Sequence, residues 1–521
     1  MPSLQRILIP ALLLVLSCSE PKQKYTRFTA EFKAPQFDDR DRKKILEETF
    51  PVIDSMFRTY AIENHFPALA YGIVADGELI HAGASGSINL KTNTAATTKS
   101  LFRIASMTKS FTAMAILKLR DEGMLSLEDP VSKYIAEVAD VTYPTQDSPE
   151  LTIQNLLTMS AGFPEDNPWG DRQLADTPDQ LISFIKEGLS FSNAPAKEFE
   201  YSNLGYAMLG MVVSSVSGMP YELFITQNIL IPLGMTDTKW EYSEVDPKLL
   251  ALGYRWEDSQ WKEEPLLHDG IYGAMGGLIT SVEDFSKYVN LHIAAWPPRN
   301  GDDTGPIKRS SIREMHKPWQ FRSLDTFTDS NGEVCASTGG YGYGLGWRRN
   351  CKGVERVSHS GGLPGFGSEY RFYPEYGVGL ICFANLTYAS AGDANANVMD
   401  TLFSMTGLKP RTIQISDTLQ LRGKQIVELL TNWNEALEKK ILAENFYLDL
   451  SRETWIKNAN ELFKNTGTIV TVDPIIPENQ LRGKFFVRGE RQDIEIFFTL
   501  TPEHAPKIQQ LDITPHKKQP K

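Results

Sequence analysis

The stretch Ser106-Met107-Thr108-Lys109 opens a long segment whose apolar side chains recur at spacings of three and four residues. This periodicity predicts a helix, and Gly123 is typical of a residue that ends one. Ser-x-x-Lys alone is a weak signal, because the sequence contains four such stretches, beginning at Ser19, Ser106, Ser183 and Ser259. Only the stretch at Ser106 stands at the start of an apolar-faced helix, which favours a chemical role there.

A serine and a lysine at this spacing have a plausible joint chemistry. The first turn of a helix carries unsatisfied backbone N–H groups and the positive end of the helix dipole. A residue three positions later returns to the same face, so Lys109 is expected beside the Ser106 hydroxyl. A desolvated lysine loses its charge near neutral pH and then accepts the serine proton. The simpler interpretation is a capping serine followed by a surface lysine.

Two further motifs favour the chemical interpretation. Tyr201-Ser202-Asn203 leads into an apolar helical run, and His359-Ser360-Gly361 leads into a predicted strand pair at 370–373 and 378–383. Each motif is weak alone, because similar residues recur at Tyr288-Val289-Asn290, His81 and His268. Their order along the chain and their settings distinguish them from these repeats.

Taken together, the three motifs resemble those of the serine β-lactamase-related hydrolases, the class C β-lactamase and D-Ala-D-Ala carboxypeptidase type. Two flanking segments, Leu151 to Gly162 and Gly276 to Asp284, are similar to that family as well. The resemblance covers about residues 48–405. It implies an α+β fold, in which an antiparallel sheet packs between helices, with an all-helical insertion and an active site between the two parts.

The resemblance assigns a role to each motif residue. Ser106 corresponds to the nucleophile that forms an acyl-enzyme, and Lys109 to its base partner. Tyr201 corresponds to the residue that moves the proton and activates the deacylating water. Asn203 corresponds to a hydrogen-bond partner of Lys109 and of the substrate amide. His359 occupies the place where β-lactamases usually carry a lysine.

The resemblance also implies an oxyanion hole and a binding strand. The backbone N–H groups of Ser106 and Gly362 are expected to form the oxyanion hole, the largest single electrostatic contribution to such a reaction. Ser360 and Gly361 are expected to contact the substrate. No cofactor and no metal ion are expected, because the histidines and cysteines do not show the spacing of a metal site.

Two departures from the family pattern bear on the substrate. A histidine has an ordinary pKa of about 6.5, so His359 is expected to offer Tyr201 a weaker positive field than a lysine, and Lys109 to do more of the base work. Gly362 supplies no side-chain hydroxyl for a substrate carboxylate. Nearby cations that could bind such a carboxylate are Lys352, Arg356 and Arg371. The sequence therefore favours a peptidase or esterase, acting on a small peptide or ester, over an efficient β-lactamase.

A second interpretation comes from a different class of protein. The fold could serve a catalytically silent scaffold or a ligand-binding lipoprotein. The complete set of Ser106, Lys109, Tyr201, Asn203 and His359 argues against it, because a silent relative has no physical need to keep all five.

The N-terminus predicts export and a lipid anchor. A charged start and an apolar run of signal-peptide length precede Val15-Leu16-Ser17-Cys18, which resembles a bacterial lipobox with Cys18 as the acylated residue. The expected location is the bacterial cell envelope, as a membrane-anchored lipoprotein facing the periplasm or the exterior. The predicted segments are a signal peptide at 1–17, a tether at 18–45, the hydrolase domain at 46–407 and a small α+β domain at 415–515.

Composition excludes several other classes of protein. The 521 residues carry a formal net charge of −12, and a nucleic-acid partner needs a cationic surface instead. The chain is 41% hydrophobic and 23% charged, which is ordinary for a globular protein and excludes a disordered one. Export permits disulfides, for which Cys335 and Cys351 are candidates, and Cys382 is expected to be a buried thiol.

The predicted domain at 415–515 carries no catalytic motif. Two helices, Gly423 to Lys439 and Arg452 to Phe463, and four strands are expected there. A binding module is the alternative role for this domain. Three of its aromatic residues are expected to be core rather than a ligand platform: Trp433, Trp455 and Phe485.

Overall fold

The structure is a computed structural model that describes residues 32–39, 41–328 and 332–518. Cys18, the predicted signal peptide and most of the predicted tether lie outside the described residues. The described chain forms two compact units, Lys33–Gln414 and a smaller one that begins at Ile415. Each unit has its own hydrophobic core.

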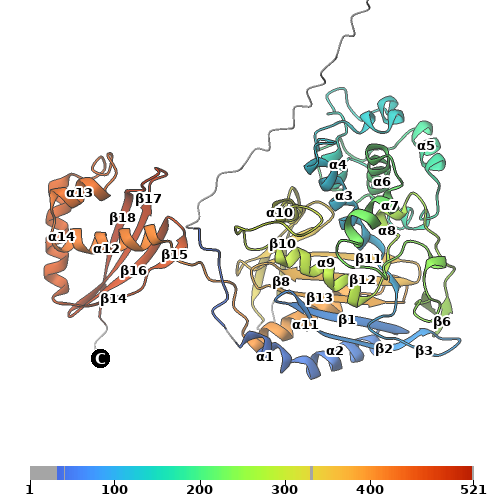
Figure 1. Cartoon of the computed structure of the whole chain (residues 1–521), viewed down its shortest axis with the longest axis horizontal. Coiled ribbons are helices and arrows are strands. Elements are labelled where there is room, and N and C mark those ends of the chain that lie inside the picture. Colours follow the sequence, from blue (N-terminus) through green and yellow to red (C-terminus); the bar gives the residue numbers. More distant parts are fainter. Residues whose placement is uncertain (1–31, 40, 329–331, 519–521) are drawn as a thin grey trace, which may run out of the picture. The chain divides into compact units, whose positions relative to one another are not determined.

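A nine-stranded antiparallel sheet organises the larger unit (Figure 1). Its strands, in spatial order, are β3 (Thr94–Ala95), β2 (Glu78–Asn89), β1 (Ala68–Ala75), β13 (Val378–Ala384), β12 (Phe366–Tyr373), β11 (Glu355–Leu363), β10 (Gly346–Asn350), β9 (Val334–Tyr341) and β8 (Gln320–Thr328). β1 and β2 form a hairpin whose turn places Asp76 and Gly77 at positive φ angles of 52° and 89°. An Asp-Gly pair is typical of such a tight hairpin turn.

Helices cover both faces of this sheet, as the α+β prediction requires. In β1, Leu69, Tyr71 and Ile73 join the core beneath α2 (Phe50–Glu63) and α11 (Ala391–Thr406). Ala70 and Val74 alternate with them and join the opposite core, which includes α9 (Val282–Ala294). Because both faces are covered, every residue of β1, β12 and β13 is buried, so these strands lack a polar–apolar alternation.

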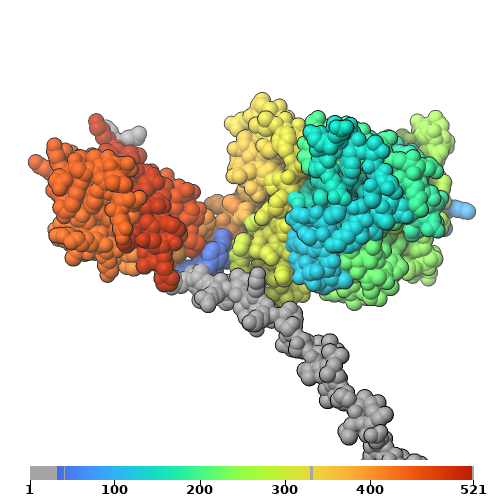
Figure 2. Space-filling model, turned by 90° about the horizontal axis from the view of Figure 1, so that it is seen from above, coloured from blue at the N-terminus to red at the C-terminus, as the bar shows by residue number. Residues whose placement is uncertain are grey.

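A helical segment lies on one side of the sheet and faces the viewer in Figure 2, coloured cyan to green. The remaining helices are α1 (Arg42–Glu47), α3 (Lys109–Asp121), α4 (Ile153–Leu157), α5 (Pro178–Glu187), α6 (Asn203–Ser217), α7 (Tyr221–Ile225), α8 (Gly273–Gly276) and α10 (Arg309–Met315). Shorter turns are η1 (Ala105–Thr108), η2 (Val131–Lys133), η3 (Ala136–Asp140), η4 (Gly170–Arg172), η5 (Thr226–Leu230) and η6 (Tyr242–Glu244). Two small ribbons complete the unit, β4 (Phe102–Arg103) with β7 (Ile279–Thr280) and β5 (Tyr254–Glu257) with β6 (Gln260–Glu263).

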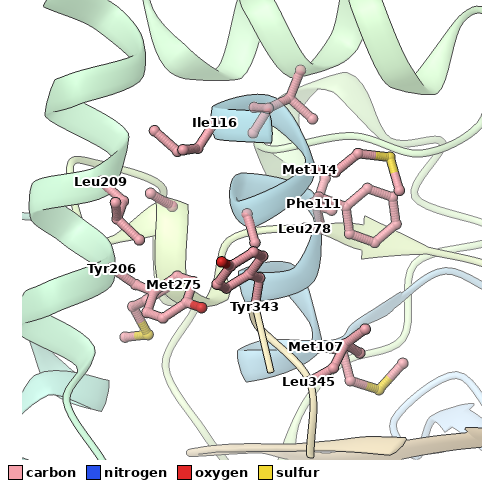
Figure 3. Close-up of a cluster of buried hydrophobic side chains, with 14 of the residues drawn as sticks. Met107, Phe111, Met114, Ile116, Tyr206, Leu209, Met275, Leu278, Tyr343 and Leu345 are labelled. Carbon is pink, nitrogen blue, oxygen red and sulfur yellow. The ribbon is translucent and has the colours of Figure 1, made fainter. Parts of the chain in front are cut away.

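The helix α3 is buried on nearly all sides, so it holds a fixed position (Figure 3). Phe111 stacks on Tyr288 with ring centroids 3.8 Å apart, while Met114 and Ile116 are fully buried in the same core. Each such side chain contributes roughly 1.5–3 kcal/mol of hydrophobic stabilisation. The segment that follows the Ser-x-x-Lys motif is therefore a rigid support for it.

Within its described residues, the smaller unit contains three helices and a five-stranded sheet. Its elements are α12 (Asp417–Thr431), α13 (Glu435–Ile441), α14 (Arg452–Thr466), β14 (Ile469–Val472), β15 (Ile476–Asn479), β16 (Arg482–Gly489), β17 (Gln492–Leu500) and β18 (Ile508–Lys517). The single helix expected at Gly423 to Lys439 is wrong, because the chain leaves the helix at Asn432 and Asn434 caps a new one. The strand β15 was not expected. Phe485 is in the core, and Trp433 and Trp455 pack partly buried against it.

The cysteines of the larger unit are arranged as the sequence suggested. Cys335 and Cys351 form a disulfide between the start of β9 and the end of β10, and Cys382 is a buried free thiol. In the described part of the chain, no single helix is long and apolar enough to cross a membrane. The pair formed by Asn203–Ser217 and Tyr221–Leu230, bent by 76°, passes that test of length and composition together.

Candidate active site

The residue before the candidate nucleophile has an unusual backbone. Ala105 has a φ of 52°, a left-handed conformation that few residues other than glycine adopt. It turns the chain sharply from β4 into η1 and then α3. Ser106 follows at once and is 7% exposed. Such strain persists only where the surrounding fold holds it.

Lys109 lies fully buried beside this serine. Its Nζ is 2.8 Å from Ser106 Oγ, 2.7 Å from Asn203 Oδ1 and 3.1 Å from the Met275 carbonyl oxygen. Burial lowers the pKa of Lys109 to about 7, although the carboxylates of Asp171 and Asp166 raise it. A neutral amine keeps two N–H donors and one lone pair. It can therefore donate to Asn203 and Met275 and accept the Ser106 proton.

Tyr201 lies just before α6, and Asn203 is the first residue of that helix. The ring of Tyr201 lies under Lys109, with Nζ 4.9 Å from its centroid. Burial raises the pKa of Tyr201 well above its ordinary value, and a hydrogen bond with Ser106 lowers it by less. Asn203 is fully buried, and its Nδ2 donates to Asn167 Oδ1 at 2.7 Å. The motif residues of α6 thus meet the Ser-x-x-Lys turn.

Two buried carboxylates stand behind Asn203. Asp166 accepts hydrogen bonds from the backbone N–H groups of Asn203 at 2.7 Å and Leu204 at 2.8 Å, so it caps α6. Asp171 accepts from Asn203 Nδ2 at 3.4 Å and from the Tyr388 hydroxyl at 3.1 Å. Burial raises the pKa of both carboxylates, and the charge of Lys109 lowers it.

His359 is held as a neutral ring by two hydrogen bonds. Its Nδ1 is 2.6 Å from the Ser360 carbonyl oxygen, which only accepts, so Nδ1 carries the proton. Its Nε2, 3.1 Å from the Tyr341 hydroxyl, is therefore the acceptor. Burial above all, and then the charge of Lys109, lower the pKa of His359 to about 3. Both ring nitrogens are in use, and His359 supplies no positive charge.

A glycine lets β11 approach the turn that carries Ser106. A Cβ on Gly361 would lie 2.2 Å from the Ile104 carbonyl oxygen and 3.0 Å from Ala105 Cβ. The strand therefore packs directly against the residues that precede Ser106. Gly362 follows, and a Cβ there would lie 2.7 Å from the Tyr388 ring. The predicted oxyanion residues Ser106 and Gly362 thus border one space.

That space is a cavity of about 770 Å³. Five of the residues singled out from the sequence motifs line it: Ser106, Tyr201, His359, Ser360 and Gly362. Lys109 and Asn203 contact the site from beneath, and Gly361 packs against η1 rather than lining the cavity.

The three cationic residues singled out from the sequence differ in whether they line the cavity. Arg356 and Arg371 line the cavity, and Lys352 does not. Arg371 pairs with the buried Glu369 at 2.8 Å, whereas the buried Nε of Arg356 has no hydrogen-bond partner within the described residues. Arg322, from β8, lines the same cavity.

Comparison with known proteins identifies the family. The family model described as Beta-lactamase matches residues 53–403. The chain belongs to the β-lactamase family. Members of this family are serine hydrolases, and the fold expected from the three motifs is confirmed.

Individual relatives of this β-lactamase family chain are distant. Protein flp from Staphylococcus aureus (strain NCTC 8325 / PS 47) is 30% identical over 341 residues, which are 64% of this chain and 62% of that protein. The chain therefore spans less than two thirds of that relative's length. Beta-lactamase-like protein 2 from Dictyostelium discoideum is 30% identical over 251 residues, 47% of this chain and 45% of that protein.

Solved structures agree with the β-lactamase family fold. The octameric penicillin-binding protein homologue from Pyrococcus abyssi aligns with a TM-score of 0.57 and 24% identity, over 89% of this chain and 98% of that one. A penicillin-binding protein from Bacillus halodurans aligns with a TM-score of 0.52 and 22% identity, over 66% of this chain and 98% of that one. At these identities the likeness concerns the fold alone.

Several site residues of this β-lactamase family chain were not found from the sequence. They are Asp166, Asn167, Asp171, Met275, Arg322, Tyr341 and Tyr388. Tyr341 lies in the Gly-rich run 339–344, whose composition is typical of an irregular strand or loop. Met275 directly precedes the Gly-Gly-Leu segment that resembles the family, so that segment was the available signal. No pattern marked Asp171 or Tyr388.

The site offers no obvious place for a metal ion. Among the described residues, no group of three or more histidine, cysteine, aspartate or glutamate side chains could hold one.

Proposed function

We propose that this chain is a serine hydrolase that acts through an acyl-enzyme at Ser106, on amide or ester bonds of small peptides or esters. The observation that carries the proposal is the contact of Lys109 Nζ with Ser106 Oγ at 2.8 Å, together with a lysine pKa of about 7. A buried, partly neutral amine at hydrogen-bond distance from a hydroxyl is the arrangement that a general base needs.

Hydrolysis needs only these side chains, the backbone donors beside them and one water molecule. Lys109 takes the Ser106 proton as Oγ bonds to the substrate carbonyl carbon, and the resulting oxyanion is expected to accept from the N–H groups of Ser106 and Gly362. The leaving nitrogen or oxygen then departs with a proton from Lys109, delivered through Tyr201. In deacylation a water oxygen bonds to the acyl carbon while its proton passes through Tyr201 to Lys109. The bond from the acyl carbon to Ser106 Oγ then breaks, Oγ regains the proton from Lys109, and the acid departs.

The environment of His359 supports a peptidase or esterase over an efficient β-lactamase. A neutral ring whose two nitrogens are already bonded neither lowers the pKa of Tyr201 nor attracts a substrate carboxylate. Gly362 adds no hydroxyl. We therefore infer that Lys109, rather than Tyr201, is the principal base for acylation.

The test is the intact mass of the chain from residue 19 after exposure to a serine-reactive fluorophosphonate, with a penicillin in a parallel sample. We expect one fluorophosphonate adduct on the parent and none on Ser106→Ala. A penicillin adduct that persists favours a peptidase. If no penicillin adduct forms, or if it is lost rapidly, ester substrates and turnover assays are the next measurements. A folded parent that forms no adduct with either reagent would instead favour a silent scaffold.

We further propose that the chain is a lipoprotein of the bacterial cell envelope, anchored through acylated Cys18. The support is the signal-like run and lipobox-like stretch in the sequence. Expression of the full chain with labelled fatty acid in a bacterium is expected to label the parent and not Cys18→Ser. Equal labelling of both proteins would contradict the anchor.

A further inference from the structure

Among the described residues, one carboxylate in the wall of the cavity has no ion-pair partner. Asp171, in η4, is 2% exposed and lines the cavity that contains Ser106. Its recorded hydrogen bonds come from Asn203 Nδ2 at 3.4 Å and the Tyr388 hydroxyl at 3.1 Å. No lysine, arginine or histidine of the described chain forms a salt bridge with it. A buried carboxylate is costly unless a cation accompanies it.

Asp171 is not needed to cap α6, because the neighbouring Asp166 does so. Asp166 already satisfies the start of α6, through the N–H groups of Asn203 and Leu204 and the Ser202 hydroxyl. Asp166 does not line the cavity. A carboxylate offers about four acceptor positions, and Asp171 spends one on a long hydrogen bond and one on Tyr388. Asp171 therefore keeps acceptor capacity on the cavity side.

We propose that Asp171 binds the protonated amino group of the substrate's acyl part, so that the preferred substrates are amides or esters of amino acids, or of peptides, with a free amino terminus. The proposal rests on the proposed function of Ser106. A chain of hydrogen bonds leads from Ser106 Oγ through Lys109 Nζ and Asn203 to Asp171, and Ser106 and Asp171 line the same cavity. An acyl group on Ser106 would then extend its amino group across this cavity toward Asp171.

The charges around the cavity select a cation at this position. Glu165 also lines the cavity, as an exposed acid. The lining arginines lie on sheet strands: Arg322 on β8, Arg356 on β11 and Arg371, paired with Glu369, on β12. The other charged or titratable groups that act on Asp171 are Lys109, Tyr388, Asp166 and Arg172. An ammonium ion bound to Asp171 would also oppose a proton on Lys109, and so favour its basic form.

Binding can be measured without turnover. The Ser106→Ala variant of the full chain is titrated calorimetrically with alaninamide, which carries a free amino group, and with N-acetylalaninamide, which does not. Both enantiomers are used. We expect alaninamide to bind at least about tenfold more tightly than its acetylated form, as is usual for one buried charge-assisted contact. Adding Asp171→Asn should remove that preference, and adding Glu165→Gln, the matched control, should keep it.

A variant that is expected to keep or strengthen alaninamide binding controls for loss of binding through misfolding. Tyr388→Phe removes the hydroxyl that donates to Asp171, so alaninamide should bind Ser106→Ala/Tyr388→Phe as tightly as Ser106→Ala or more tightly. Equal affinity of Ser106→Ala for the two amides, or a preference that survives Asp171→Asn in a folded protein, would overturn the proposal. So would weaker alaninamide binding in folded Ser106→Ala/Tyr388→Phe.

The same reagents distinguish a failure of the Asp171 proposal from a failure of the proposed hydrolase function. In the protein with Ser106 intact, alaninamide should slow fluorophosphonate labelling, and N-acetylalaninamide should not. Labelling without protection contradicts the role of Asp171 and leaves the serine hydrolase standing. Alaninamide binding without any labelling contradicts the hydrolase and leaves an amino-group site.

Discussion

At the scale of single residues, burial sets the protonation states of Lys109 and His359. Both side chains lie in the interior, and burial disfavours the charged form of each. Lys109 becomes partly neutral, with a pKa of about 7, and His359 becomes fully neutral, with a pKa of about 3. One basic group near neutrality remains beside Ser106.

Acylation of Ser106 should therefore follow the titration of Lys109. The neutral amine is the active form, so the rate of fluorophosphonate labelling should rise with pH with a midpoint near the lysine pKa of about 7, and fall below it. Lys109→Met should slow labelling by a factor of about 10² or more. Stopped-time mass spectrometry across neutral pH gives the rates.

Tyr201→Phe is the control for that profile. If Lys109 is the base, this variant keeps the same midpoint, because burial holds the pKa of Tyr201 far above the range of the experiment. Total loss of acylation in a folded Tyr201→Phe protein would assign the base role to Tyr201 instead.

Tyr341 should fix the proton position on His359. Its hydroxyl donates to Nε2, so Tyr341→Phe removes a bond that exists only with the neutral ring, and the His359 pKa should rise. The unpaired Nε2 should also cost about 1–3 kcal/mol of folding free energy. Nitrogen NMR of labelled histidine and denaturant unfolding measure the two effects.

Tyr343→Phe is the matched change in the same Gly-rich run. Tyr343 stacks on Trp319 with ring centroids 5.5 Å apart and has no recorded bond to His359. Tyr343→Phe should therefore leave the nitrogen NMR signals of His359 unchanged. A His359 ring that is protonated at about pH 5 in the parent would contradict the neutral form derived from its burial.

At the scale of elements, the site depends on how closely β11 approaches η1. Gly361→Ala would bring a Cβ to 2.2 Å from the backbone oxygen of Ile104, so strand and turn must separate. We expect labelling of Ser106 to fall by a factor of about 10² from this displacement, because misplacement by about 1 Å has that cost. The labelling rate of the folded variant measures it.

Gly205→Ala provides the comparison for a glycine near the site. In α6 a Cβ on Gly205 meets its nearest neighbour at 3.7 Å, an ordinary contact. A helical glycine replaced by alanine should gain about 0.5–1 kcal/mol of stability, with labelling unchanged. Equal labelling by Gly361→Ala and the parent would mean that β11 does not position the nucleophile turn.

At the scale of the whole molecule, the catalytic candidates and their support lie within the larger unit. The smaller unit has a separate core that includes Phe485 and Phe498. A chain that ends at Gln414 should therefore fold and label at Ser106 within about threefold of the parent, since separate cores are typical of independent domains. Circular dichroism and labelling rates check this, and a folded truncation that no longer labels would assign the smaller unit a part in the reaction.

The sequence alone determined the features that depend on local order. The hairpin at Asp76-Gly77, the helix that starts at Ser281 and the segment that carries Ser106 follow from turn chemistry, capping and periodicity. The family followed from three ordered motifs. Short-range rules failed where local signals competed, as at Asn432, where one expected helix became two.

Only the tertiary structure decided the state of the site. The pKa of Lys109 depends on burial, and the role of His359 depends on Tyr341, a residue in another strand. Asp171 and Tyr388 are far apart in the chain and meet across the cavity, where no spacing rule applies. Sequence supplies residue types and local geometry, whereas desolvation and long-range contact arise only when distant segments pack together.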